Sequence, residues 1–246
     1  KADLHCHLGG VLDVDGLIGA AMTNQEAVFS ACQANPGFKE WKIKAEFAVN
    51  KLDVPFFKPW AGRWKALGGQ FPGFYRSTVI SALLSAFQNN PVFLHQWVYG
   101  SVQPMEQYCS VGIEKYEANG DLQGCALLGS ETALRYVLQH LVSKCSQENV
   151  TYCEVRCSPA KYTTEGMDIH KVTSVIQEEL SKSVKTQFKV IIIASRHGSP
   201  DEMNAHIHLV MSLSEQPEFD KWFAGFDLAG NEQVISPGEL REVFDP

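Results

Sequence analysis

The sequence lacks features that would assign it to several common classes of protein. Its longest apolar runs, such as residues 190–194, fall far short of the roughly 20 apolar residues that a membrane-spanning helix requires. Basic residues are not in excess: 21 Lys and Arg against 28 Asp and Glu give a net charge of −7, which argues against broad binding of nucleic acid. There is also no Gly-x-Ser-x-Gly turn, no P-loop or dinucleotide-binding glycine loop, and no His-x-Glu followed by Pro-Cys-x-x-Cys. We therefore expect no membrane span, no broad nucleic-acid interface and none of these three kinds of active site; a local basic groove stays open as an alternative.

The composition that remains is that of a globular protein. With 246 residues, 45% hydrophobic and 20% charged, the chain can bury a sizeable core as one large domain or two small ones. Seven cysteines are an odd number in a chain too large to need stapling, so we expect reduced thiols and a cytoplasmic location rather than a secreted disulfide scaffold. No signal peptide is visible, and because the first residue is Lys1 we expect the true N-terminus to lie upstream.

Three regions of the chain differ in their patterns. Residues 1–10 read as a single strand, residues 11–149 as a helical subdomain, and residues 150–246 as alternating strands and helices. In the third region we expect strands at 150–157, 188–194 and 222–228, and helices at 168–184, 200–214 and 237–244. Such alternation predicts parallel strands joined by crossover helices, and therefore an α/β sheet or barrel.

The helical region has apolar side chains at helical spacing in residues 77–89 and 130–144. It also carries many aromatic residues between Lys, Pro and Gly: Trp41, Phe47, Phe56, Phe57, Trp60, Trp64, Phe71, Phe74 and Tyr75. A surface that stacks nucleotides would use such residues. A packed helical subdomain is the favoured interpretation, because aromatic side chains dominate protein cores.

His5 and His7 are the sharpest signal of chemistry. Apolar side chains alternate here with Asp3, His5 and His7, so both imidazoles of the predicted strand can face one metal ion. Gly9 ends the strand and places them at its C-terminal end, where α/β barrels build active sites. Zinc requires at least three protein ligands and a water, so further His or Asp ligands must come from elsewhere.

Two other pairs carry weaker signals. His206 and His208 lie on a predicted helix, where residues two apart diverge by about 200°, so we expect a solvated helix face. Cys153 and Cys157 have the spacing of a zinc pair but lie on one predicted strand, and buried core thiols are the favoured interpretation.

Charged residues end the predicted strands of the third region. Glu154 and Arg156 share a face of one strand, and Arg196 and His197 close the next. Charges at these positions are costly to bury alone, so they either pair with each other, which is the favoured interpretation, or serve a site.

Four segments in order carry a resemblance to a known family: residues 1–10 (KADLHCHLGG), 152–159 (YCEVRCSP), 193–197 (IASRH) and 226–232 (FDLAGNE). Together they resemble strands one to four of the adenosine and AMP deaminases, which are metal-dependent amidohydrolases. The resemblance implies about the first four βα units of a (β/α)8 TIM barrel, with residues 11–149 as a helical insertion between strands one and two. Only four strands can be counted where a barrel needs eight, so we expect the rest beyond Pro246.

The resemblance also implies the reaction and its residues. His5 and His7 match the first two zinc ligands, and Gly230 matches the glycine whose backbone N–H reads a purine ring nitrogen. The implied activity is zinc-dependent hydrolytic deamination at C6 of adenine, with one Zn²⁺ per subunit, although imidazole also suits other divalent metals. We find no His-Ala-Gly-Glu and no Asp-Asp pair, so the third ligand and the catalytic Glu and His are expected past Pro246, and no catalytic residue is expected in these 246.

Gly9 departs from the small adenosine deaminases, which resemble this segment but have Asp there, beside the ribose 5′ end. A carboxylate would repel a 5′ phosphate, and its absence removes that charge and opens space. We therefore expect a 5′-phosphorylated substrate: ATP or dATP, converted to ITP or dITP, ahead of AMP or adenosine.

Residues 112–117 and 120–124 look similar to the large defence-associated deaminases of prokaryotes. That resemblance implies antiviral defence, a homo-oligomer, and a partner ATPase or regulatory domain. Two alternatives stay open: a catalytically inactive deaminase-like module that builds an assembly, and an amidohydrolase that acts on a cyclic amide, a phosphotriester or another base.

Overall fold

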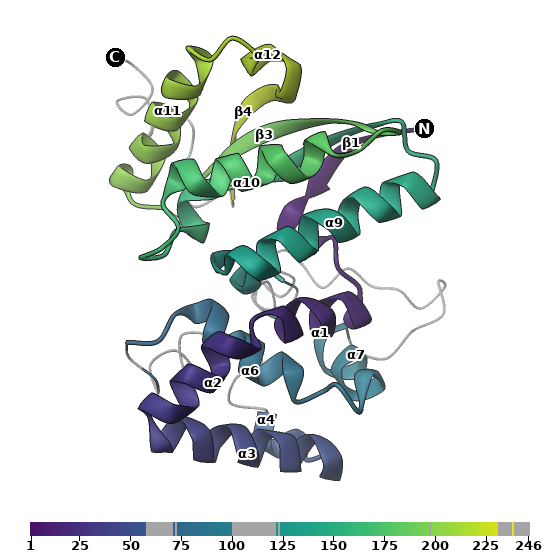
Figure 1. Ribbon diagram of the computed structural model, residues 1–246, viewed down its shortest axis with the longest axis vertical. Helices are drawn as coiled ribbons and strands as arrows, with labels where there is room; N and C mark the ends of the chain where they lie inside the picture. Colours follow the sequence, from purple (N-terminus) through teal and green to yellow (C-terminus); the bar gives the residue numbers. More distant parts are fainter. Residues whose placement is uncertain are drawn as a thin grey trace. The chain divides into compact units, whose positions relative to one another are not determined.

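The structure is a computed structural model that describes residues 1–57, 71, 73–99, 122, 124–196, 198–230 and 238. Its internal contacts divide the chain into two compact units (Figure 1). The sheet unit comprises Lys1–Leu8 and Leu141–Pro246, and the helical unit comprises Gly9–His140. The division predicted at residues 10 and 149 lies near these bounds, and its meaning for the domains of the complete protein stays a prediction.

Four parallel strands form the sheet: β1 (Ala2–His7), β2 (Tyr152–Cys157), β3 (Gln187–Ser195) and β4 (Phe223–Ala229). They are hydrogen-bonded in the order of the chain, β1-β2-β3-β4, and every neighbouring pair is parallel. This confirms the predicted α/β class with a parallel sheet. The described residues contain these four strands, so closure into an eight-stranded barrel stays a prediction.

Helices join the strands of the sheet unit: α9 (Glu131–Gln147), α10 (Ile169–Ser181), α11 (Pro200–Ser214) and α12 (Phe219–Trp222). Because successive crossovers move the same way across the sheet, right-handed connections place their helices on one face. Along β2 the alternate side chains Cys153, Val155 and Cys157 are buried on that helix-covered face. The other face of the sheet is called the open face below, and its β2 side chains are only partly buried.

Capping residues explain where two of these helices begin. The Asp168 carboxylate accepts a hydrogen bond of 2.7 Å from the backbone N–H of Lys171 at the start of α10. Ser199 caps α11 in the same way, with Pro200 at the first helical position. Caps of this kind satisfy backbone N–H groups that have no partner within the helix.

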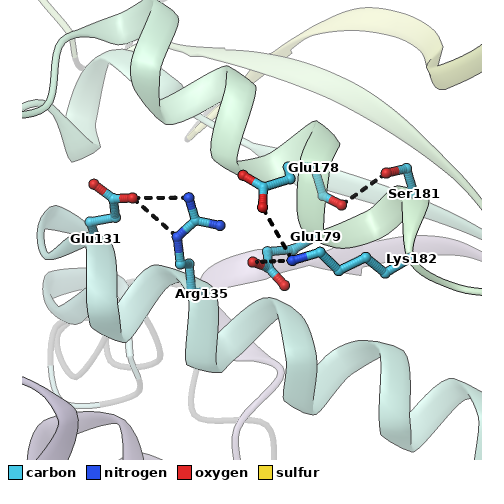
Figure 2. Close-up of polar contacts among 6 residues, drawn as sticks. All are labelled: Glu131, Arg135, Glu178, Glu179, Ser181 and Lys182. Carbon is cyan, nitrogen blue, oxygen red and sulfur yellow. Dashed lines mark hydrogen bonds and ion pairs between the residues drawn. The ribbon is translucent and has the colours of Figure 1, made fainter.

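Short-range ion pairs form in α9 and at the C-terminal end of α10 (Figure 2). Lys182, the residue that caps α10, donates to Glu178 at 3.2 Å and to Glu179 at 2.8 Å. The Glu179 side chain is only 1% exposed, so this lysine supplies the positive charge that a buried carboxylate requires. In α9, Arg135 donates to Glu131 through two nitrogens.

The helical unit contains η1 (Leu8–Gly10, its first residue in the sheet unit), α1 (Val14–Thr23), α2 (Gln25–Ala34), α3 (Pro36–Lys51), α4 (Val54–Phe57), α6 (Arg76–Ser85), α7 (Pro91–Tyr99) and η4 (Cys125–Gly129). Helix α6 is its centre, because eight consecutive residues of α6 are buried and α1, α2, α3 and η4 all contact it. In Figure 1, α6 lies between α1 and α3.

Aromatic side chains form much of the helical core. Phe38 packs against Trp41, Phe71 and Phe74, with ring centroids 5.0–5.6 Å apart. Phe57 packs against Phe87 and Phe93. Core packing is thus observed for several of the predicted aromatic residues, whereas Phe47 and Tyr75 are exposed. Trp60 and Trp64 lie outside the described residues.

Several predicted helix and strand ends shift in the structure. The helix predicted at 77–89 ends at Ser85, and the one at 130–144 continues to Gln147. The strand predicted at 222–228 begins one residue later, because Trp222 belongs to α12. The segments at 112–117 and most of 120–124, and the helix predicted at 237–244 apart from residue 238, lie outside the described residues.

Two further expectations concern the whole chain. Within the described ranges, no helix is long and apolar enough to cross a membrane. No disulfide joins the cysteines in this part of the chain. Cys109 lies outside it.

Candidate functional site

His5 and His7 lie on β1 with exposed side chains. Their Nε2 atoms are 2.9 Å apart, so both nitrogens approach one point. Two ligands of one tetrahedral zinc ion, each about 2.0–2.1 Å from the metal, lie about 3.3 Å from one another. A small adjustment of the rings therefore fits this pair to one zinc ion. The structure brings the two predicted ligands together, and their binding of a metal stays a prediction.

A β-bulge in β1 sets the direction of these side chains. The pairing of β1 with β2 shifts register between Asp3 and Cys6, and Asp3 Oδ1 accepts a hydrogen bond of 3.0 Å from the backbone N–H of His5. Aligned residues of parallel strands share a face, so Asp3, opposite Cys153, lies on the helix-covered face. The predicted simple alternation, with Asp3 beside His5 and His7, is therefore wrong, because the extra residue moves Asp3 to the opposite face.

Arg156 extends the site across the open face. It is the register partner of His7, and its guanidinium forms an ion pair with Asp227 on β4. The side chains of Arg156 and Asp227 are 13% and 37% exposed. The pKa of His7 is lowered from its ordinary value, first by burial and then by the positive charges of His5 and Arg156. These effects favour the neutral imidazole, which is the form that binds metals.

The predicted charge pairs are arranged differently from the expectation. Arg156 pairs with Asp227 rather than with Glu154, and Glu154 accepts a hydrogen bond of 2.8 Å from the Tyr152 hydroxyl. Arg196 is buried at the end of β3, and His197 lies outside the described residues. Sequence reasoning assigned no role to Asp227. An acidic residue between apolar neighbours in a predicted strand was the available signal.

Gly230 ends β4 with a positive φ of 120°, a backbone conformation that side chains disfavour. The position predicted to read a purine therefore requires glycine for its backbone geometry. Among the described residues, no hydrogen bond involving its backbone N–H is recorded.

Gly9 is packed more closely than expected. A Cβ atom at Gly9 would lie 2.3 Å from Cys125 Sγ. The expectation that glycine at this position opens space is therefore wrong, because the side chain of Cys125, also in the helical unit, fills the space next to Gly9. The absence of a carboxylate charge at this position still holds.

The two weaker pairs, His206 with His208 and Cys153 with Cys157, have different outcomes in the structure. His206 is fully buried: its Nε2 accepts from the backbone N–H of Ala160 at 3.2 Å, and its Nδ1 lies 2.9 Å from Glu202 O. The predicted solvated face is wrong for His206, because α11 turns it toward η5 (Pro159–Tyr162), and holds for His208, which is exposed. Cys153 and Cys157 are buried, which agrees with core thiols.

Comparisons with known proteins identify the family of the chain. Residues 102–245 match the family model described as adenosine deaminase, and the chain belongs to the adenosine deaminase family. Adenosine deaminase from Enterococcus faecalis is 24% identical over 120 residues, which is 48% of this chain and 34% of that protein. The Streptococcus mutans enzyme is 25% identical over 121 residues, 48% of this chain and 33% of that protein. The chain thus spans about a third of the length of these curated relatives.

A solved structure shows the same fold. The N6-methyl-AMP deaminase of Arabidopsis thaliana superposes with a TM-score of 0.50 at 14% identity, covering 100% of this chain and 54% of that chain. At this identity the likeness shows the fold alone, an α/β fold with a parallel sheet similar to that of the TIM-barrel deaminases.

Proposed function

We propose that this chain contributes the first two metal ligands to an enzyme that hydrolytically deaminates the adenine base of a nucleotide or nucleoside. The observation that carries the proposal is the convergence of His5 and His7 Nε2 at 2.9 Å, in a chain of the adenosine deaminase family. Zinc is the proposed metal, because the donor set and the spacing suit it. When bound, zinc supplies an activated water at neutral pH.

The chain's own residues have distinct roles in this proposal. His5 and His7 hold the metal as neutral imidazoles. Arg156 and Asp227 neutralise each other on the open face, so the site keeps a fixed cation near His7 without an unpaired charge. Gly230, with a backbone that a side chain would strain, presents its N–H for the ring nitrogen of a purine.

The proposed substrate carries a 5′ phosphate, with ATP or dATP ahead of AMP and adenosine. Support comes from the neutral Gly9 two residues beyond His7, where a carboxylate would repel phosphate. Adenosine is the main competitor, because the two curated relatives are adenosine deaminases. A homo-oligomer and a role in antiviral defence belong to the same proposal.

The test uses the full-length protein purified with zinc. It is incubated separately with ATP, dATP, AMP and adenosine, and the products are separated by chromatography. We expect conversion of a nucleotide to its inosine counterpart, and loss of that conversion in the His5→Ala/His7→Ala variant. His208→Ala is the matched control, since His208 is also exposed but lies on α11.

Two outcomes would contradict the proposal. If zinc is bound and none of the four compounds is converted, the protein is an amidohydrolase with another substrate. If no metal is bound and none is converted, the chain is part of a structural module.

A further inference from the structure

A second group of metal-ligand side chains lies on the helix-covered face of the sheet. The ligand atoms of Asp3, Cys6 and Cys153 all lie within 4.8 Å of one another. Asp3 is exposed, Cys6 is partly buried and Cys153 is fully buried. The group is therefore exposed to solvent at the Asp3 carboxylate and buried at the Cys153 sulfur.

The bulge in β1 assembles this group. Without the extra residue between Asp3 and Cys6, the strand's alternation would direct Asp3 to the open face with His5 and His7. With it, Asp3 is the register partner of Cys153, and Cys6 is the partner of Val155 on the same face. One bulge thus separates two sets of donors: imidazoles on one face, and a carboxylate with thiols on the other.

A third thiol comes from helix α9. Cys145 is buried, and burial raises the pKa of its thiol, a shift that the neighbouring Cys153 thiol opposes. Two sulfurs and one carboxylate therefore meet from β1 and β2, and the third sulfur, on α9, neighbours Cys153. Cys157, four residues beyond Cys153 on β2, is equally buried but belongs to no such group.

We propose that Asp3, Cys6 and Cys153, with Cys145 as the fourth ligand, bind one thiophilic divalent metal ion such as zinc, separate from the His5–His7 centre. Four ligands with two or more thiolates are the composition of structural zinc sites. Ligand atoms of a tetrahedral site with Zn–S near 2.3 Å are about 3.7 Å apart, so the spacing of Asp3, Cys6 and Cys153 closes with small side-chain movements. The Cys145 thiol would have to turn toward the other three to complete the site.

A metal ion at this site would stabilise the position of β1. A metal held by this group cross-links β1 to β2 and to α9. Strand β1 lies at an edge of the sheet among the described strands, and it carries His5 and His7 on its other face. The cross-link would hold the strand that presents the two histidines, without contact with substrate.

Cobalt(II) distinguishes the two proposed sites, because thiolate ligands give an intense charge-transfer absorption in the near ultraviolet and imidazoles do not. Full-length protein, stripped of metal and kept in a phosphine reductant, is titrated with Co²⁺. We expect the thiolate band in the wild type and in the His5→Ala/His7→Ala variant. Cys157→Ser is the matched control for a buried thiol of β2, and it should keep the band.

Variants of the group should weaken binding. We expect Cys6→Ala and Asp3→Asn to reduce cobalt affinity at this site at least about tenfold, since even loss of an outer-shell partner has that effect. Both positions are at least partly exposed, so these variants should fold, and circular dichroism checks that they do. Cys153→Ser should weaken the band, because it removes one of the thiolate ligands.

The proposal is overturned if the wild type shows no thiolate band, or if Cys6→Ala and Asp3→Asn leave its affinity unchanged. It is also overturned if the reduced protein binds no cobalt but two thiols of the group disappear on treatment with hydrogen peroxide, which would identify a disulfide pair. Failure of the deaminase proposal would leave the thiolate band intact, so the two results are separable.

Discussion

Replacing Gly9 with aspartate tests the proposed substrate, and the structure shows that this change must be made together with a second one. A Cβ atom at Gly9 would lie 2.3 Å from Cys125 Sγ, whereas ordinary contact begins at 3.4 Å, so the sulfur would have to move by 3.4 − 2.3 = 1.1 Å. Overpacking of this kind costs about 1–3 kcal/mol. Cys125 is exposed, so we expect the low end, about 1 kcal/mol, and a fall in Tm of roughly 2–4 °C.

Cys125→Ala removes the sulfur and with it the clash. The Cβ of residue 125 would lie 3.4 Å from a Cβ at residue 9, which is an ordinary contact. The informative variant is therefore Gly9→Asp in the Cys125→Ala background. With a carboxylate about 6 Å from a phosphate and an effective dielectric constant near 20, each pair of unit charges repels by about 3 kcal/mol, or roughly 100-fold in rate. We expect kcat/KM for ATP to fall by up to that factor relative to kcat/KM for adenosine.

The assay compares kcat/KM for the two substrates in three proteins: Cys125→Ala alone, with Gly9→Asp, and with Gly9→Asn. The asparagine variant has the same shape without the charge, so it should leave the ratio between the substrates nearly unchanged. An equal fall on nucleotide and nucleoside in the aspartate variant would refute the reasoning about the 5′ phosphate.

Two further predictions concern buried or strained groups. Burial lowers the pKa of His206 below its usual 6.5, so the unfolded chain binds a proton more readily than the folded chain does. The free energy of unfolding should therefore be highest above about pH 6.5 and decrease below it. His206→Gln, which keeps an acceptor for the Ala160 N–H, should make this pH dependence weaker in denaturant titrations at several pH values, and an unchanged dependence would contradict the prediction. Gly230→Ala should cost about 1–2 kcal/mol, because φ is 120° at this position, just after β4. Gly225→Ala within β4, where an added Cβ meets nothing within 4 Å, should cost less than about 1 kcal/mol, and equal costs would contradict the strain argument.

The sequence predicted what local periodicity determines. Helix α11 has the predicted bounds, and β3 differs from its prediction by one residue at each end. The Ser199 cap, followed by Pro200, explains the success for α11, since both are local signals. The division into a helical part and an alternating part was also predicted from patterns alone, and its meaning for the domains of the complete protein stays a prediction.

What the sequence did not predict depends on register and tertiary packing. The bulge between Asp3 and Cys6 is a single extra residue in a pairing with a strand some 150 positions away along the chain. The Arg156–Asp227 pair likewise joins strands that are not neighbours in the sheet. His206 was misassigned because the covered side of α11 is set by its packing on η5 and β3, which periodicity does not identify.

The most direct test of the central claim is a crystal structure of the full-length protein grown with zinc, with diffraction measured on both sides of the zinc absorption edge. The account predicts an anomalous peak within about 2.0–2.1 Å of Nε2 of both His5 and His7. A peak at the thiol group alone, or none at these two histidines with zinc present in excess, would contradict the metal centre on which the proposed deamination depends.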